Sequence, residues 1–305
     1  MEYEAALLVE PENATALNNL GFALAQQGRL NEAIELYTKA IELDPKRGMA
    51  FVNLGIARAT TGEVDLGIHA LERATEVDPK NILAWDNLGR LQLSVGNATA
   101  AERAWRQALS LAPSDGRLLV SFGTALAAQQ RLGEAIDVLR RATHFDPTSA
   151  RGWAQLGAVL FLNQDLGSAT ESLERALALD PSDQDARRHL ALTLLARGRE
   201  EEAGAEMERV VEASPKNVPA LVDLGVLLLS KRDLEQALRM LDAALSQDSQ
   251  ETRARFYRAV VLDQLGRSSE SGSELRSLAE ETVGKYADRA REYSAWRGRG
   301  NGLGL

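Results

Sequence analysis

The sequence predicts an all-α protein built as a solenoid, in which pairs of helices repeat along the chain. An internal period of 34 residues supports this prediction, because helical repeat arrays have periods of about this length. A hydrophobic content of 45% and an aromatic content of only 5% also suit packed helices better than a β-sandwich. The period is plainest in seven of the eight prolines, each 34 residues after the last: Pro11, Pro45, Pro79, Pro113, Pro147, Pro181 and Pro215.

Each unit of the period contains two amphipathic helices joined by a short polar turn. In the first unit, Leu17, Leu20 and Gly21 fall on one face of the first helix, and Ala33 and Tyr37 share a face of the second. Proline ends the second helix because it lacks a backbone N–H and disfavours helical geometry in the residue before it. One pair of helices leaves its apolar stripe half covered, so we expect stacked neighbours to close it.

Eight units follow from this period, and we place them over residues 14–283. Residues 1–13 are in register with the second half of a unit, so we interpret them as a half repeat. It either caps the array at its N-terminal end or belongs to a longer protein. The units begin at Ala14, Gly48, Ile82, Gly116, Ala150, Gln184, Val218 and Thr252.

The C-terminal end departs from the pattern. In the last unit Arg255 and Arg258 replace apolar residues, which weakens the predicted packing of its first helix. Residues 284–297 continue an apolar helical stripe and predict a capping helix, whereas the glycine-rich residues 298–305 predict a disordered tail. The capping helix also allows a second interpretation, a docking site for an acidic partner, because it is rich in cations: Lys285, Arg289, Arg291, Arg297 and Arg299.

The repeat resembles the tetratricopeptide repeat (TPR) family over roughly residues 3–282. This resemblance implies a right-handed superhelical α-solenoid whose first helices line a concave face. The third unit matches the family pattern most fully, at Trp85, Leu88, Gly89, Ala101, Trp105, Ala108 and Pro113.

The side of the first helices opposite the leucine–glycine stripe is more apolar than a plain surface helix requires. Either adjacent first helices contact each other there, or the residues line an exposed trough that binds a partner. Leu83 and Val120 fall on this side. We predict an apolar groove from Phe22, Val52, Ile56, Phe161, Leu192, Val222, Val226, Phe256 and Val260.

A column of polar residues spaced by 34 follows the same side. Asparagine offers a donor and an acceptor together, so a row of asparagines can pair with an extended peptide backbone. The column also resembles the asparagine ladder of O-linked N-acetylglucosamine transferases, although asparagine is common at this place across the family. Arg90, Arg117, Arg151, Arg188 and Arg253 add cations, but not in the arrangement of the co-chaperone carboxylate clamp. The predicted peptide-binding column is Asn19, Asn53, Asn87, Ser121, Gln155 and His189, continued by Asp223 and Tyr257.

Composition argues against several classes of function. A net charge of -9 disfavours nucleic-acid binding, and the absence of cysteine excludes thiolate catalysis and cysteine-ligated zinc. The three histidines, His69, His144 and His189, are far apart in the sequence and predict no metal site. We therefore expect no enzyme activity and no cofactor.

The leading hypothesis is a scaffold or assembly factor that binds extended or amphipathic helical segments of other proteins. The alternative is the substrate-recruiting arm of a larger enzyme such as a glycosyltransferase, and a third hypothesis is self-association through the terminal repeats. No apolar run is long enough to predict membrane insertion. The arginine-rich and alanine-rich composition suggests a bacterial genome. We expect the cytoplasm, with the periplasm or an organelle left open if the chain is processed or truncated.

Overall fold

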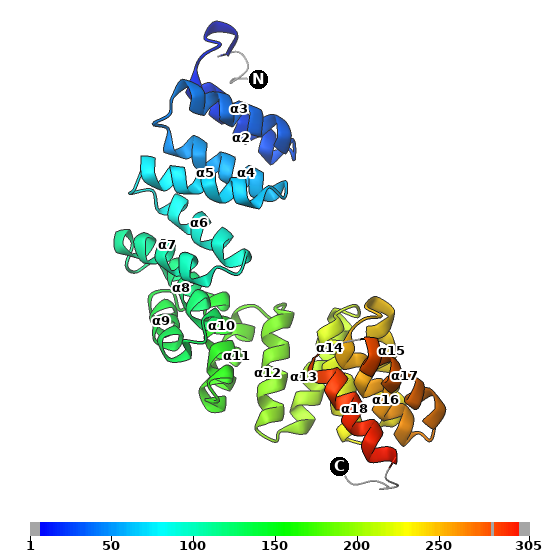
Figure 1. Ribbon diagram of the computed structural model, residues 1–305. Coiled ribbons are helices and arrows are strands. Elements are labelled where there is room, and N and C mark those ends of the chain that lie inside the picture. The colour runs from blue at the N-terminus through cyan, green and yellow to red at the C-terminus, as the bar shows by residue number, and fades with distance from the viewer. Residues whose placement is uncertain (1–6, 282–283, 299–305) are drawn as a thin grey trace. The chain divides into compact units, whose positions relative to one another are not determined.

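The computed structural model describes residues 7–281 and 284–298, and this part of the chain consists of helices joined by short turns (Figure 1). The prediction of an all-α solenoid of paired helices is confirmed. Residues 1–6, which belong to the predicted half repeat, and residues 299–305 of the predicted tail lie outside the described residues.

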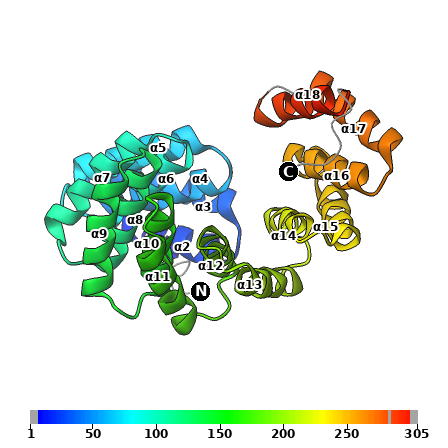
Figure 2. The same cartoon turned by 90° about the horizontal axis from the view of Figure 1, so that it is seen from below.

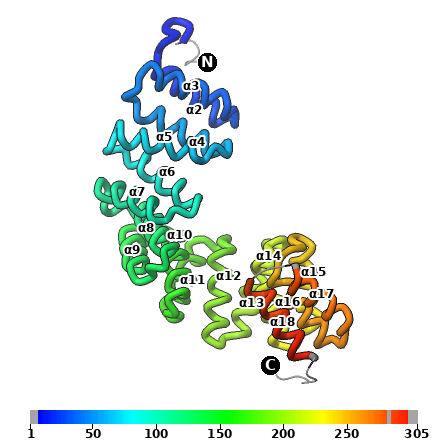
Figure 3. Tube along the Cα trace, in the orientation of Figure 1, coloured from blue at the N-terminus to red at the C-terminus, as the bar shows by residue number. Residues whose placement is uncertain are grey.

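The chain divides into two compact units, Met1–Asp165 and Leu166–Leu305, and the boundary falls between the two helices of the fifth repeat. Within each unit the helices follow one another along the chain (Figure 3). The helices of the first unit are α2 (Ala14–Gln26), α3 (Leu30–Leu43), α4 (Gly48–Thr60), α5 (Val64–Val77), α6 (Ile82–Ser94), α7 (Ala98–Leu111), α8 (Gly116–Ala128), α9 (Leu132–Phe145) and α10 (Ala150–Leu162). Those of the second unit are α11 (Leu166–Leu179), α12 (Gln184–Ala196), α13 (Glu200–Ala213), α14 (Val218–Ser230), α15 (Leu234–Gln247), α16 (Thr252–Gln264), α17 (Ser268–Glu281) and α18 (Lys285–Gly298).

The even-numbered helices from α2 to α16 are the first helices of the repeats, and they begin at the eight residues from which we count the units. A capping side chain explains most of these starts. The residue before the helix accepts a hydrogen bond from a backbone N–H in the first turn, which contributes about 1 kcal/mol per cap. These caps are Asn13, Asn81, Asp115, Ser149, Asp183, Asn217 and Glu251.

The turn inside each repeat needs a left-handed residue at one position. Five repeats place glycine there, which adopts this conformation without a Cβ clash. Three repeats place a larger residue in the same conformation: Gln130 (φ 61°), Gln164 (φ 63°) and Arg232 (φ 61°).

Close approach of the two helices of a repeat explains the leucine–glycine pairs. A Cβ added to Gly89 of α6 would lie 2.7 Å from Cε2 of Trp105 on α7, and one added to Gly123 of α8 would lie 2.7 Å from Cγ of Leu139 on α9. Trp105 and Leu139 are fully buried. These glycines therefore admit a large side chain from the second helix into the centre of the repeat.

The last repeat is packed despite its arginines, so the expectation of weakened packing is wrong. Arg255 is buried, and its Nε lies 2.8 Å from the Glu274 carboxylate on α17. Arg258 pairs with the same carboxylate at 2.9 Å and with Asp242 of α15 at 2.6 Å. Ion pairs between neighbouring helices thus satisfy charges that a helical wheel places on the apolar side.

Helix α18 packs against α17 and α16, as a capping helix should (Figure 2). Tyr286, Ala290 and Tyr293 join a cluster with Phe256 and Leu275. Most of its basic residues are engaged within the second unit. Arg291 pairs with Asp288, Arg297 pairs with Asp263, and Arg289 donates a hydrogen bond to the Tyr257 hydroxyl.

Candidate functional site

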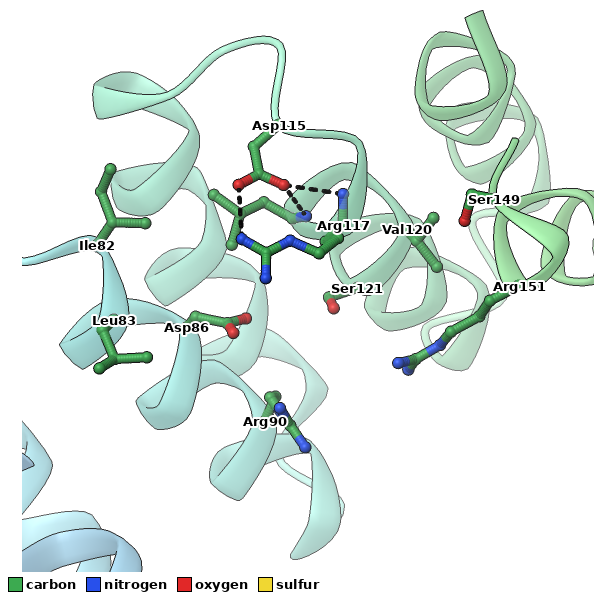
Figure 4. A pocket seen from close by; sticks show the side chains of 11 residues that line it. Ile82, Leu83, Asp86, Arg90, Asp115, Arg117, Val120, Ser121, Ser149 and Arg151 are labelled. Carbon is green, nitrogen blue, oxygen red and sulfur yellow. Dashed lines mark hydrogen bonds and ion pairs between the residues drawn. The ribbon is translucent and has the colours of Figure 1, made fainter. Parts of the chain in front are cut away.

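Residues of the first helices of three successive repeats, α6, α8 and α10, and of the turns before α8 and α10 line a pocket of about 390 Å³ (Figure 4). We call the side on which it opens the first-helix face. The pocket lies wholly within the first unit. Its lining residues are Ile82, Leu83, Asp86, Arg90, Asp115, Arg117, Leu118, Val120, Ser121, Ser149 and Arg151.

Three arginines from three helices give the pocket its charge. Arg90 comes from α6, Arg117 from α8 and Arg151 from α10, and all three are exposed. Arg117 Nη2 lies 3.3 Å from the Asp115 carboxylate, yet its side chain remains 88% exposed. In residues 7–281 and 284–298, no carboxylate forms an ion pair with Arg90 or Arg151.

The two acidic residues of the pocket have structural partners. Asp86 accepts a hydrogen bond of 2.8 Å from Nε1 of the buried Trp105. Asp115 caps α8 by accepting hydrogen bonds from the backbone N–H groups of Arg117 and Leu118. Three arginines against these two carboxylates leave the lining of the pocket with a net positive charge.

The apolar part of the pocket is centred on α6. Leu83 is 46% exposed, which leaves a large apolar side chain beside the arginines. Val120 and Leu118 line the pocket from α8 but are themselves buried. The pocket thus combines one accessible apolar contact with several hydrogen-bond donors.

The structure brings only part of the predicted polar column into this pocket. Ser121 lines it, whereas Asn87 lies on α6 with its Nδ2 donating to the Leu83 carbonyl at 2.8 Å. Nearer the N-terminal end, Asn53 donates to Oδ1 of the buried Asn18 at 3.0 Å, and Asn18 donates to Asn19 at 3.2 Å. The early asparagines therefore link neighbouring first helices.

The later members of the column also have partners. Gln155 Oε1 accepts a hydrogen bond of 3.4 Å from Thr124, and His189 Nδ1 lies 2.8 Å from the Asp185 carbonyl oxygen. Asp223, on α14, is buried. Two arginines hold its side chain.

Four residues of the predicted apolar groove are buried, so they are core residues and the prediction that they line an exposed groove is wrong. Val52 contacts the core around α4 and α6, and Val222 belongs to the core of the second unit. Phe256 and Val260 are covered by the cluster that includes α18. Contact between adjacent first helices, the alternative that the sequence left open, accounts for Val52 and Val222, whereas α17 and α18 cover Phe256 and Val260.

The other groove residues are accessible to different extents. Phe22 is 52% exposed and Ile56 is 40% exposed. Phe161, Leu192 and Val226 are half-buried. Only these five retain surface that a partner can cover.

Among the residues that line the pocket, only Ser121 was a predicted site residue, while Leu83, Val120 and the three arginines were placed on this side of the helices without being predicted as binding residues. The remaining five were not noted: Ile82, Asp86, Asp115, Leu118 and Ser149. Three of them lie at or just before the start of a first helix. A signal did exist in the sequence, because a residue at the start of a first helix can reach the polar column of the preceding repeat, as Arg253 reaches Asp223.

A second group of charges lies on the first-helix face of the second unit. Arg253 Nη1 lies 2.6 Å from Oδ1 of Asp223, and Arg188 Nε donates to Oδ2 at 2.7 Å. The three residues come from α16, α14 and α12 and join three successive repeats. This face holds its carboxylate internally, unlike the pocket of the first unit.

No helix in the described ranges combines the length and apolarity needed to cross a bilayer. Across residues 7–281 and 284–298, no group of three or more His, Cys, Asp or Glu side chains is placed to hold a metal ion.

Stacked pairs of helices, a glycine-mediated contact within several of the pairs and a pocket on the first helices together define a helical repeat scaffold for protein interactions. Sequence profiles identify the family. Residues 14–47 and 87–150 match tetratricopeptide repeats, and residues 128–255 match the TPR domain of cytochrome c-type biogenesis protein H. The chain belongs to the tetratricopeptide repeat family.

Solved structures similar to this chain share its fold. A TPR protein from Parabacteroides merdae is 17% identical, with a TM-score of 0.67, and the match covers 82% of this chain and 98% of that one. Pseudomonas aeruginosa pilF is 20% identical, with a TM-score of 0.60 and coverage of 70% and 96%. YrrB, described as a TPR protein with an unusual peptide-binding site, is 21% identical, with a TM-score of 0.50 and coverage of 61% and 95%. No curated protein matches the chain significantly.

Proposed function

We propose that this protein binds an extended segment of another protein in the pocket formed by α6, α8 and α10. One observation carries the proposal: the exposed Leu83 lies in the same pocket as Arg90 and Arg151. Neither arginine has an ion-pair partner in the part of the chain that the structure describes. A segment lying across the three helices covers the apolar contact and satisfies the donors together.

The volume of the pocket suits a few side chains of such a segment. About 390 Å³ is within the usual range of small binding sites, roughly 300 to 1,000 Å³. Because the first helices continue on either side of the pocket, an extended partner can reach further contacts at Ile56 of α4 and Phe161 of α10. The description of YrrB as peptide-binding is in keeping with this use of the fold.

The role of an assembly factor is the finer part of the proposal. It is supported by the match of residues 128–255 to the TPR domain of a protein named for cytochrome c biogenesis. A scaffold of this kind needs no reactive group, since it acts by holding a segment of its client.

The proposal is tested by selecting linear peptides from a random display library on the intact protein and measuring their Kd by fluorescence anisotropy. Leu83→Ala removes apolar contact of up to about 2 kcal/mol if the peptide covers the side chain, so we expect Kd to rise by about tenfold. Leu66→Ala is the matched control, because Leu66 is a similarly exposed leucine, at 51%, on the second helix α5. Equal affinity of wild type and Leu83→Ala for every selected peptide would place binding elsewhere.

A further inference from the structure

The second unit shows how this fold holds a carboxylate between two successive first helices. Asp223 is the sixth residue of α14, and Arg253 is the second residue of α16. Their closest atoms, Oδ1 and Nη1, are 2.6 Å apart. The Asp223 side chain is only 3% exposed, because Arg253 and Arg188 enclose it. Charge-assisted hydrogen bonds of this kind are stronger than neutral ones.

The same two repeat positions recur in the first unit without a carboxylate. Ser121 is the sixth residue of α8, and Arg151 is the second residue of α10. Both line the pocket, and Arg151 extends from α10 toward α8 (Figure 4). One repeat earlier, Asn87 and Arg117 occupy the same pair of positions on α6 and α8.

We infer that the partner segment is acidic, and that two of its side-chain carboxylates lie beside Ser121 and Asn87, where Asp223 lies in the second unit. This inference rests on the proposed function and adds the chemistry of the partner. Arg151 and Arg117 then bind the incoming carboxylates as Arg253 binds Asp223.

The spacing of the two carboxylates follows from the helices. Neighbouring packed helices lie about 8–10 Å apart, and an extended segment in the polyproline II conformation advances about 3.1 Å per residue with three residues per turn. Two of its carboxylates that are three residues apart, as in Glu-x-x-Glu, therefore point to the same side and lie about 9 Å apart, which matches two successive first helices. An extended neutral segment fills the pocket without using either arginine.

Other charges around the pocket determine how strongly such a segment binds. Asp86 stands where the second unit has Arg188, and its carboxylate is engaged by Trp105. Asp115 partly occupies Arg117. Arg90, on the following turn of α6, supplies the third cation of the pocket. With three arginines against two carboxylates, we expect a preference for acidic segments that weakens as salt is added.

The test compares two synthetic peptides with acetylated and amidated ends, so that terminal charges play no part. One carries Glu-x-x-Glu in a serine and valine frame, and the other carries Gln-x-x-Gln at the same positions. We expect the intact protein to bind the glutamate peptide at least fivefold more tightly by fluorescence anisotropy. Arg151→Gln and Ser121→Asp should each abolish this preference, the second because its new carboxylate pairs with Arg151.

Two control variants separate the local effect from net charge. Arg73→Gln removes an exposed arginine from α5, and Ser110→Asp adds a carboxylate to the exposed end of α7. Both should keep the preference for glutamate. If wild type binds the two peptides equally and Leu83→Ala weakens the binding of both, the inference that the partner is acidic is overturned. The proposed function then still stands. Binding of neither peptide would count against both.

Discussion

Glu102 is the most strongly held carboxylate among the described residues of the first unit, and its pKa predicts how the stability of this unit depends on pH. The side chain on α7 is only 10% exposed. Burial raises its pKa, but hydrogen bonds from Gln129 (2.9 Å), Arg106 (2.8 Å) and Arg131 (2.7 Å) outweigh burial and lower the pKa from 4.5 to about 2. The charged form is therefore favoured in the folded protein.

The size of this effect follows from the difference between the folded and unfolded pKa values. A pKa lowered by about 2.5 corresponds to about 3 kcal/mol of folding free energy at 1.36 kcal/mol per pH unit. This contribution is fully present above pH 4.5, where the unfolded carboxyl is also ionised. It falls as the pH drops toward the folded value of about 2, and only about 1.4 kcal/mol remains at pH 3.

Glu102→Gln tests this reasoning because glutamine keeps the shape of the side chain and removes its charge. We expect the variant to be less stable than wild type by up to about 3 kcal/mol at pH 7, and the difference to shrink by about half at pH 3. Urea unfolding followed by far-ultraviolet circular dichroism, at several pH values between 3 and 7, measures both quantities.

The matched control is Glu134→Gln. Glu134 also accepts hydrogen bonds from Arg131, and these bonds lower its pKa, but its side chain is 58% exposed, so we expect a much smaller change in stability. A difference between wild type and Glu102→Gln that stays constant from pH 3 to pH 7 would refute the assignment, because a purely steric effect has no pH dependence.

Three further substitutions test the packing of the repeats by urea unfolding. Gly89→Ala should destabilise by about 1–3 kcal/mol, since the new Cβ would lie 2.7 Å from Trp105 and displace the indole. Gln130→Gly should stabilise by about 0.5–1 kcal/mol, because glycine adopts φ 61° without strain. Glu274→Ala should destabilise by about 2 kcal/mol, as it removes the carboxylate that both Arg255 and Arg258 contact.

Each of these substitutions has an outcome that would contradict its reasoning. Unchanged stability of Gly89→Ala would mean that the two helices of the third repeat separate at little cost. A loss of stability in Gln130→Gly would show that the glutamine side chain stabilises the turn more than its backbone conformation costs. If Glu274→Ala were neutral, the ion pairs of the last repeat would not contribute to its packing.

The starts of the first helices could be predicted from the sequence because one period fixes caps, turns and glycine contacts together. Asn81, Gly96 and Gly89 each mark one of these features in the third repeat, and each has its counterpart 34 residues away in other repeats. Local chemistry and the global fold therefore agree at these positions.

The candidate site was harder to predict, because a helical wheel does not show whether a residue faces solvent or packs against a neighbouring first helix. Val52 and Ile56 lie one turn apart on α4, yet Val52 is fully buried and Ile56 is 40% exposed. Likewise, the wheel does not show that Arg253 forms an ion pair with Asp223 on the preceding first helix, whereas Arg151 and Ser121, at the same two positions, line a pocket. Both distinctions depend on how each helix is seated against the next repeat.

The repeat therefore divides its positions between packing and recognition. At the position of Gly89 and Gly123 a Cβ would collide with the second helix, so the solenoid restricts this position to small residues. At the sixth position of the first helix no such contact exists, and the chain places Asn87, Ser121 and Asp223 there in different repeats. In the second unit Asp223 makes this junction hold its own carboxylate, whereas in the first unit Ser121 stands at the same position and Arg151 has no ion pair among the described residues, which is where we propose that a carboxylate of the partner binds.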